Sequence, residues 1–147
     1  MCMQYEVLRL LNNQKFCFLG TSYTEKPHVS LMNFTYCPEE KVIILSSRKD
    51  TAKVIHIRGN PNVSILVSNL ADNSSNPISC TIQGSAKILK PGDDARFREK
   101  HYNKNRDMSG FIIGKNIIVI KVEISHILVS DSHDKVWEWP ANVFYSL

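Results

Sequence analysis

The sequence predicts a mainly β domain, a small barrel of six or seven largely antiparallel strands with two or three short helices outside it. Three observations support this class. Short apolar segments rich in branched and aromatic residues recur along the 147 residues, turn residues separate them, and only a few stretches show a helical period. Closure into a barrel removes sheet edges that would otherwise stay unpaired. A chain of this length is expected to form one domain, residues 1–147, with a sizeable core.

The predicted elements follow one another through short connections. A helix with one apolar side is expected over 3–12. Strands are expected at 15–22, 28–36, 41–47, 62–69, 78–89, 116–130 and 135–140, with further helices at 51–58 and 91–105. Gly84, in the middle of a long strand, predicts a bulge or a close approach by another group. The last residues, 141–147, are an apolar tail.

The composition is that of an ordinary globular protein, with 43% hydrophobic and 22% charged residues. The net charge of +4 mildly favours anionic ligands and does not by itself indicate nucleic acid. The basic segment 100–106 is better explained as a solvated helix end than as a nucleic-acid site. No apolar run is long enough to span a membrane and the N-terminus does not resemble a signal peptide, so a cytoplasmic protein is expected.

Cysteine and histidine spacing predicts no metal site. Cys2, Cys17, Cys37 and Cys80 form no CxxC pair, and we interpret them as reduced thiols, mostly buried. The five histidines, at 28, 56, 101, 126 and 133, show no HxH or HExxH spacing. No GxSxG motif or Cys–His pair is evident, so nucleophilic catalysis has no support.

The segment 46–61, "SSRKDTAKVIHIRGNP", carries an unusual charge pattern. It reads as a strand end followed by a short helix, for which Asp50 is the expected N-cap and Gly59 the expected end. Arg48, Lys49 and Lys53 crowd the N-terminal end of this helix. The helix dipole disfavours a cation there by roughly 0.3–1 kcal/mol. An anion bound at this turn would offset the unfavourable interaction between these cations and the helix dipole.

A phosphate would satisfy this turn. The free N–H groups at a helix start favour an anion, Ser46, Ser47 and Thr51 supply hydroxyls, and Arg48 and Lys53 supply charge. A solvated basic turn is the alternative interpretation. The glycines of a Walker loop are missing, so a nucleotide held through a single terminal phosphate fits better. The Lys49 side chain is expected to point into solvent.

Three segments resemble a known family. "KPHVSLMNF", "VIILSSRKDTAKVIHIRGNPNVSILV" and "IQGSAKI" are similar to the FMN-binding split barrel of the pyridoxamine 5′-phosphate oxidase-like superfamily, and the resemblance covers roughly residues 5–130. It implies a six-stranded antiparallel Greek-key split barrel that forms a homodimer, with FMN at the dimer interface.

The resemblance also implies a set of cofactor contacts. The family's phosphate-binding lysine falls on Lys53, its nearby hydroxyl on Thr51, and its partner-chain glutamine near Ser79 or Gln83. Trp137 or Trp139 matches a family tryptophan; the two alternate on one strand and face the same side, where packing in a core or dimer seam is the other interpretation. The implied cofactor-binding residues are His28, Val29, Ser30, Met32, Asn33, Ser46, Ser47, Arg48, Thr51, Lys53, Ser79, Gln83 and Trp137.

The sequence departs from the oxidase proper in ways that bear on the substrate. The oxidase has arginine at the position of His28, lysine at Asn33 and a second phosphate arginine at Ala52, and its Arg/His-rich C-terminal substrate motif is absent here. We therefore expect an FMN-binding, flavin-dependent oxidoreductase that acts on an unidentified small molecule, with no catalytic residue assigned. The alternatives are a barrel that binds F420 or haem, a non-catalytic flavin-binding or storage module, and a basic interaction domain.

Overall fold

The computed structural model describes residues 2–146. The fold is mainly β, as predicted, with all strand pairs antiparallel. The strands are β1 (Phe16–Tyr23), β2 (Lys26–Asn33), β3 (Thr35–Cys37), β4 (Val42–Arg48), β5 (Asn62–Ser68), β6 (Ile78–Ile88), β7 (Ile117–Asp131) and β8 (Val136–Pro140). The helices are α1 (Met3–Asn13), α2 (Ala52–Gly59), α3 (Ala95–Lys104), α4 (Ala141–Ser146) and the short 3₁₀ helices η1 (Leu70–Asp72) and η2 (Arg106–Phe111).

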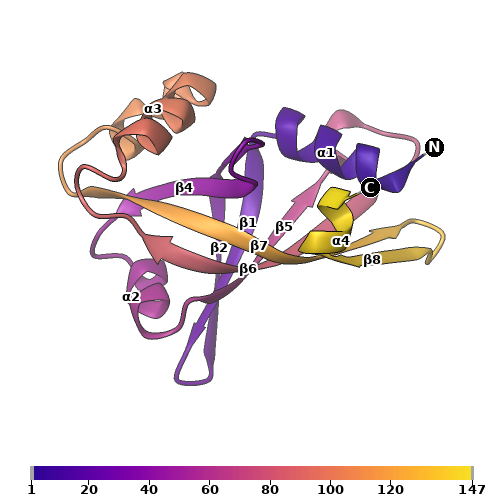
Figure 1. The fold of residues 1–147 in the computed structure, drawn as a ribbon, viewed down its shortest axis with the longest axis horizontal. Coiled ribbons are helices and arrows are strands. Elements are labelled where there is room, and N and C mark those ends of the chain that lie inside the picture. The colour runs from indigo at the N-terminus through magenta and orange to yellow at the C-terminus, as the bar shows by residue number, and fades with distance from the viewer. Residues whose placement is uncertain (1, 147) are drawn as a thin grey trace.

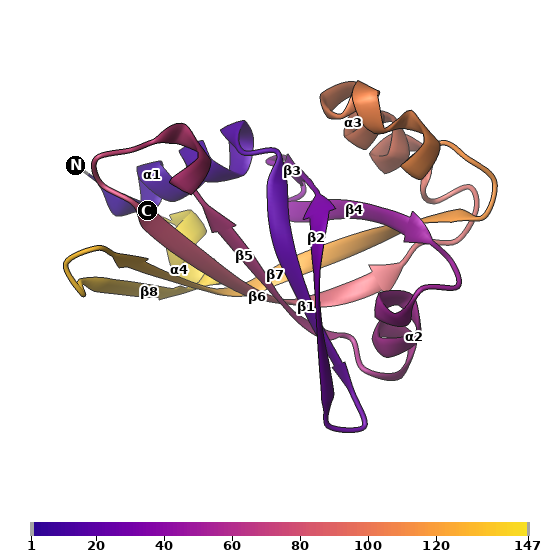
Figure 2. The same cartoon turned by 180° about the vertical axis from the view of Figure 1, so that it is seen from behind.

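The eight strands form one strongly curled sheet in the order β2-β1-β5-β6-β7-β4-β3, with β8 paired to β7 (Figures 1 and 2). The eight strands exceed the six or seven predicted. Part of the difference is that the expected strand 28–36 is two strands, β2 and β3, separated only by Phe34. These two strands lie at opposite ends of the order, so the chain leaves β1 at Phe34 and continues along β4. Phe34 is fully buried, and its N–H donates to the Lys15 carbonyl (3.2 Å), which fixes this bend.

The long pair β6–β7 contains the irregularity predicted at Gly84. The register of the two strands shifts between Gln83 and Gly84. A Cβ atom on Gly84 would lie 2.5 Å from the carbonyl oxygen of Glu123, closer than a side chain tolerates. Both parts of the prediction, a bulge and a close approach, are confirmed, and the bulge bends the sheet around its core.

The core fills the inside of the curl, and helices cover its open parts. α1 buries Val7, Leu10 and Leu11 against it. The predicted apolar tail is, in its described part, the helix α4, because Phe144 finds a place in the core and meets the Trp139 ring edge-on, 5.6 Å between centroids. Trp137 and Trp139 both pack against this core, so they share a face as their alternation predicts.

The helix α2 (Figure 1) connects β4 to β5 and contacts β1, β2 and β6. The prediction that Asp50 caps it is wrong, because Thr51 occupies the N-cap position and Asp50 is exposed. Thr51 is drawn back to the sheet by its hydroxyl, which lies 2.9 Å from the Ser47 hydroxyl at the end of β4. Gly59 is the last helical residue as expected, and the Tyr23 ring packs where its Cβ would lie.

Among the described residues, no helix has both the length and the apolar character needed to cross a bilayer.

Candidate functional site

A cavity of about 290 Å³ opens between the ends of β2 and β4, the start of α2, the C-terminal part of α3, and η2. Seven of the residues predicted to bind the cofactor line it: Met32, Asn33, Ser46, Ser47, Arg48, Thr51 and Lys53. They come from two segments far apart in the sheet order, and the curl of the sheet brings these segments together. The remaining lining residues are Leu31, His101, Met108, Phe111 and Ile112.

One end of the cavity is cationic. Arg48 is exposed and Lys53 is half-buried at the start of α2. Burial, and secondly the Arg48 charge, lowers the pKa of Lys53. No carboxylate among residues 2–146 forms an ion pair with either side chain. Two neighbouring cations without a counter-ion, one of them partly desolvated, make this end attractive to an anion.

Hydroxyl groups surround the same end. The Ser47 and Thr51 hydroxyl oxygens lie 2.9 Å apart, and each lies within donating distance of the Arg48 carbonyl oxygen, at 3.0 and 3.2 Å. A hydroxyl proton rotates to suit its neighbours, so both groups can turn toward a ligand. The Ser46 hydroxyl already has a partner. It donates to the Phe111 carbonyl oxygen at 2.6 Å, a hydrogen bond that connects η2 to β4. The Lys49 side chain is exposed and does not line the cavity, as predicted.

The other end of the cavity is neutral and partly apolar. His101, 1% exposed, is held by Thr35, whose Oγ1 lies 2.7 Å from Nδ1 of the imidazole. Asn105, also buried, bonds to Thr35 (3.2 Å) and accepts a hydrogen bond from Asn33 (2.9 Å). Burial, and secondly the Lys104 charge, lowers the pKa of His101 to about 4, so its imidazole is neutral at pH 7.

Sequence reasoning missed this network, since it treated segment 100–106 as a solvated helix end. That expectation is wrong for His101 and Asn105, which face the sheet. A signal was present: Phe97, His101 and Asn105 recur every four residues and mark one side of α3. All three are buried, whereas Asn103 between them is exposed.

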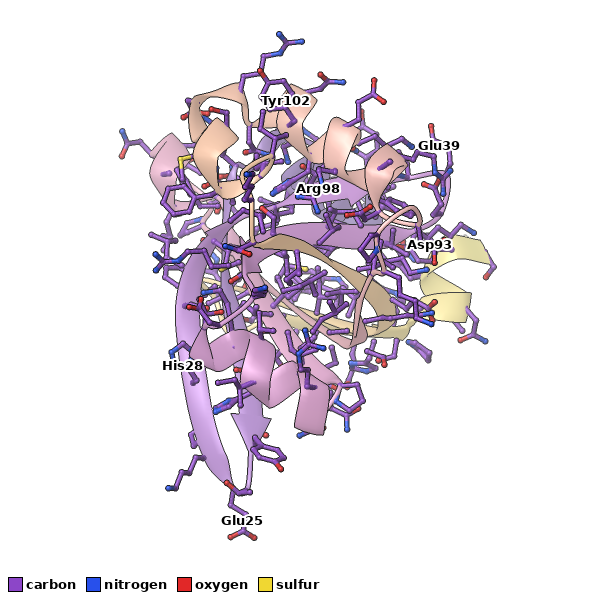
Figure 3. The ribbon with its side chains drawn as sticks, turned by 90° about the vertical axis from the view of Figure 1, so that its left-hand side faces the viewer. Glu25, His28, Glu39, Asp93, Arg98 and Tyr102 are labelled. Carbon is purple, nitrogen blue, oxygen red and sulfur yellow. The ribbon has the colours of Figure 1, made fainter. Side chains whose placement is uncertain are left out.

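Three other predicted residues lie on β2 but outside the cavity. Val29 points outward and is 67% exposed. His28 and Ser30 face the other way, and the Nδ1 atom of His28 and the Oγ atom of Ser30 are buried without a hydrogen-bond partner in the described chain. His28 lies along the edge of the β1–β2 hairpin, whose tip carries Glu25 (Figure 3), and its ring is 6.0 Å from that of His56. These two buried polar atoms are exceptions to the rule that buried polar groups are hydrogen-bonded.

The last three predicted residues lie on β6 and β8 and do not line this cavity. Ser79 is bonded to Ser130, with 2.8 Å between the hydroxyl oxygens. Gln83 is exposed on the outer face of β6. Trp137 packs against the core from β8. None of them lines the cavity, so within a single chain the structure does not bring them to Arg48 and Lys53.

No group of three or more His, Cys, Asp and Glu side chains within residues 2–146 is arranged to hold a metal ion.

Comparison with known proteins identifies the family. A family model described as pyridoxamine 5′-phosphate oxidase matches residues 3–127. The chain belongs to the pyridoxamine 5′-phosphate oxidase family. It is 28% identical to a pyridoxamine 5′-phosphate oxidase homolog of Schizosaccharomyces pombe, over 92% of this chain and 90% of the relative.

Solved structures share the family's split barrel. A heme-binding protein from Mycobacterium smegmatis superposes with a TM-score of 0.82 at 14% identity, over 99% of this chain and 61% of the other. A FAD-binding protein from Mesorhizobium loti superposes with a TM-score of 0.73 at 15% identity, over 85% of this chain and 90% of the other. Flavin- and haem-binding proteins therefore share this architecture, and at such identities the likeness establishes the fold alone.

Proposed function

We propose that this protein binds FMN in the cavity at the start of α2 and acts as a flavin-dependent oxidoreductase on a small molecule. The observation that carries the proposal is the pair Arg48 and Lys53. They line one cavity, lack a carboxylate partner in the described chain, and stand at a helix start where a dianionic phosphate is favoured.

The residues at this end suit a terminal phosphate. Lys53 and Arg48 supply charge, and Ser47 and Thr51 supply hydroxyl donors. The first N–H groups of α2 have no partner within the helix and add further donors. Each charge-assisted hydrogen bond contributes roughly 1.5–3 kcal/mol.

The strand β2 suits the rest of the cofactor. The predicted cradle runs from His28 to Asn33, and the unpartnered polar atoms of His28 and Ser30 lie on it. A ribityl chain or ring edge would contact this strand at its cavity-lining residues Met32 and Asn33. When bound, the flavin supplies hydride transfer, and the protein binds the ring, orients it and limits its contact with water.

We further propose that the active form is a homodimer with flavin at the interface. The outer face of β1 and β2 presents Phe16, Phe18, Val29 and Leu31, each close to half exposed or more. Leu31 also lines the cavity, so this apolar patch is continuous with the site. An exposed apolar patch of this kind marks an interface, and a second copy of the chain is the occupant we propose.

The register of the sheet supports this arrangement. Phe18 pairs with Leu66 and Gly20 with Ser64, and Ser64 in turn pairs with Gln83, so Gln83 stands on the same outer face as the patch. A second copy packed on that face would bring its Gln83 toward the first copy's flavin. Ser79 lies on this face as well, whereas Trp137 faces the core, and its predicted cofactor contact stays a prediction.

The dimer is tested by placing a charge on the patch. Phe18→Glu should convert the dimer to a monomer of unchanged fold, measured by light scattering after size-exclusion chromatography, because burying an unpaired carboxylate is unfavourable. Glu25→Lys, at the exposed hairpin tip, is the control. A parent protein that is monomeric at the same concentration would contradict the interface.

The function is tested first by the cofactor itself. The protein, purified without added ligand or titrated with FMN, should show flavin absorbance, and the released cofactor should have the mass of FMN. A Soret band would indicate haem instead, and a deazaflavin spectrum would indicate F420. A colourless protein that FMN does not stabilise against heat would contradict the proposal.

Turnover is a separate question from binding. Reduction of the bound flavin by NADH or NADPH should be followed by stopped-flow absorbance, and oxidation of pyridoxamine phosphate serves as a comparison reaction. Flavin that binds tightly but is reduced by neither nucleotide would favour a storage or carrier role. We place the activity in the cytoplasm, in keeping with Cys17, Cys37 and Cys80, which are buried free thiols.

A further inference from the structure

A backbone carbonyl fixes the direction of the hydrogen bonds around His101. The side-chain amide of Asn105 lies 3.1 Å from the carbonyl oxygen of His101. A carbonyl oxygen only accepts, so the Asn105 atom that faces it is the nitrogen, Nδ2. The Asn105 oxygen then faces Asn33, which donates to it at 2.9 Å. The orientation of both amides follows from this one contact.

The same logic assigns the tautomer of His101. Asn105 Nδ2 also donates to the Thr35 hydroxyl oxygen, at 3.2 Å. Since that oxygen accepts from Asn105, the hydroxyl proton of Thr35 is free to be donated to His101 Nδ1, 2.7 Å away. Asn105 Nδ2, which can only donate, also lies 3.3 Å from Nδ1. Nδ1 therefore faces two donors and is the acceptor nitrogen, and the imidazole proton resides on Nε2.

The Nε2–H group has no partner in the described chain. His101 lines the cavity, and its hydrogen bonds to Thr35 and Asn105 all involve Nδ1 or the backbone. Among residues 2–146, the side-chain nitrogen and oxygen atoms that are fully buried without a partner belong to His28, Ser30 and Glu40, so Nε2 of His101 is not sealed in the protein. The cavity is the space onto which it opens.

The surroundings of Nε2–H select a particular kind of ligand group. Met108, Phe111 and Ile112 make this end of the cavity apolar, and no charged side chain of the described residues lines it. Arg48 and Lys53 lie at the start of α2, the other end of the same cavity. A ligand that spans the cavity is therefore expected to be anionic at one end and uncharged and hydrogen-bond accepting at the other.

We propose that His101 contacts the ring system of the bound flavin, as a fixed neutral donor whose Nε2–H bonds to an acceptor atom on the ring edge. This rests on the proposed function and deepens it, because it assigns the residue that contacts the ring end of the cofactor. Thr35 and Asn105 act through His101 as positioning residues. They hold its tautomer and leave it no second orientation.

A neutral donor at this position affects the two redox states differently. The reduced ring is richer in electrons than the oxidised ring and accepts a hydrogen bond more strongly. Removing the donor should therefore weaken binding of reduced FMN more than binding of oxidised FMN. The midpoint potential of the bound flavin then becomes more negative. This readout would not move if His101 were only part of the core.

The inference is tested on the parent chain by NMR of ¹⁵N-histidine, with the His101 signals assigned by their loss in His101→Gln. The His101 imidazole should be the Nε2–H tautomer, and saturation with FMN should shift its Nε2 resonance. His133, exposed on the β7–β8 turn, is the internal control and should not shift. A Nδ1–H tautomer, or an Nε2 resonance that FMN leaves in place, would overturn the inference.

A pair of variants provides the second measurement. The amide of Gln can donate from a position near that of Nε2, whereas Leu cannot donate. His101→Leu should weaken oxidised FMN binding by about three- to tenfold and make the flavin potential more negative, and His101→Gln should restore most of both. Equal potentials in the parent and both variants would refute the contact. If the parent does not bind FMN, the proposed function fails, and this inference fails with it.

Discussion

The two ends of the cavity differ in charge, in burial and in how firmly their polar groups are held. At the start of α2, Arg48 and Lys53 are accessible, charged and without a carboxylate partner, and the nearby hydroxyls can rotate. At the α3 end, His101 is buried, neutral and held in one orientation. Charge attracts a ligand over a distance and tolerates small displacements, whereas a fixed hydrogen bond in an apolar wall accepts one geometry. In the proposed complex, the first end supplies affinity and the second supplies orientation.

The comparison also shows which part of the site costs folding energy. The cationic end keeps Arg48 in solvent, so only Lys53 is partly desolvated. The neutral end buries His101 and Asn105 almost completely, and their hydrogen bonds offset that burial. Changes at the first end should therefore act on ligand affinity, and changes at the second end should act on stability as well.

The largest expected effect comes from removing both cations. Arg48→Ala combined with Lys53→Ala should weaken FMN binding by about a hundredfold or more, because two charge-assisted contacts are lost. The free energy of unfolding without ligand should be nearly unchanged, since neither side chain forms an ion pair in the described chain. Calorimetric titration measures the FMN affinity, and urea unfolding measures the free energy of unfolding. An affinity within threefold of the parent's would show that these two cations do not hold the ligand.

The burial of neutral His101 should make the free energy of unfolding depend on pH. The pKa of His101 is about 4 in the folded chain and about 6.5 when unfolded, so the unfolded state binds more protons between these values. Stability should therefore fall as the pH drops from about 6.5 to 4, with about 3 kcal/mol of the loss due to this residue. Urea unfolding of the parent and of His101→Gln isolates that share. The same pH slope in both proteins would show that His101 is not buried and neutral.

The support of His101 should be visible in a smaller loss of stability. Asn105→Ala removes the donor to Thr35 and the acceptor for Asn33, and should cost about 1–3 kcal/mol of unfolding free energy. Asn103→Ala, two residues away on the exposed side of α3, should change stability by less than about 0.5 kcal/mol. Equal effects of the two substitutions, measured by urea unfolding, would show that the hydrogen bonds of Asn105 do not stabilise the fold.

The two ends differ in how far the sequence predicts them. Residues 46–53 are contiguous, so the clash between three cations and a helix start can be recognised from the sequence alone. The network at the other end joins Thr35 to His101 and Asn33 to Asn105, across 66 and 72 residues. Its helical periodicity can be read from the sequence, but the partner strand cannot, because tertiary packing decides which surface α3 covers.

The same distinction between local signals and tertiary packing applies to the fold. Alternation and turn residues locate the strands, and Gly84 marks the bulge, because these signals are local. The break of the second strand at Phe34 has no such local signal, since it depends on β4 being available to pair with Thr35. The Asp50 cap is wrong for a similar reason: the Ser47–Thr51 hydrogen bond, a contact between strand and helix, sets where α2 begins.

The central claim, that the start of α2 holds the FMN phosphate, is tested most directly by comparing FMN with riboflavin, which lacks the phosphate. The affinities of both ligands should be measured by fluorescence titration for the parent, Lys53→Ala and Lys49→Ala. In the parent and in Lys49→Ala, FMN should bind at least about tenfold more tightly than riboflavin. In Lys53→Ala this advantage should largely disappear, because a phosphate contact is lost. An unchanged FMN advantage in Lys53→Ala, or riboflavin binding as tight as FMN in the parent, would contradict the account.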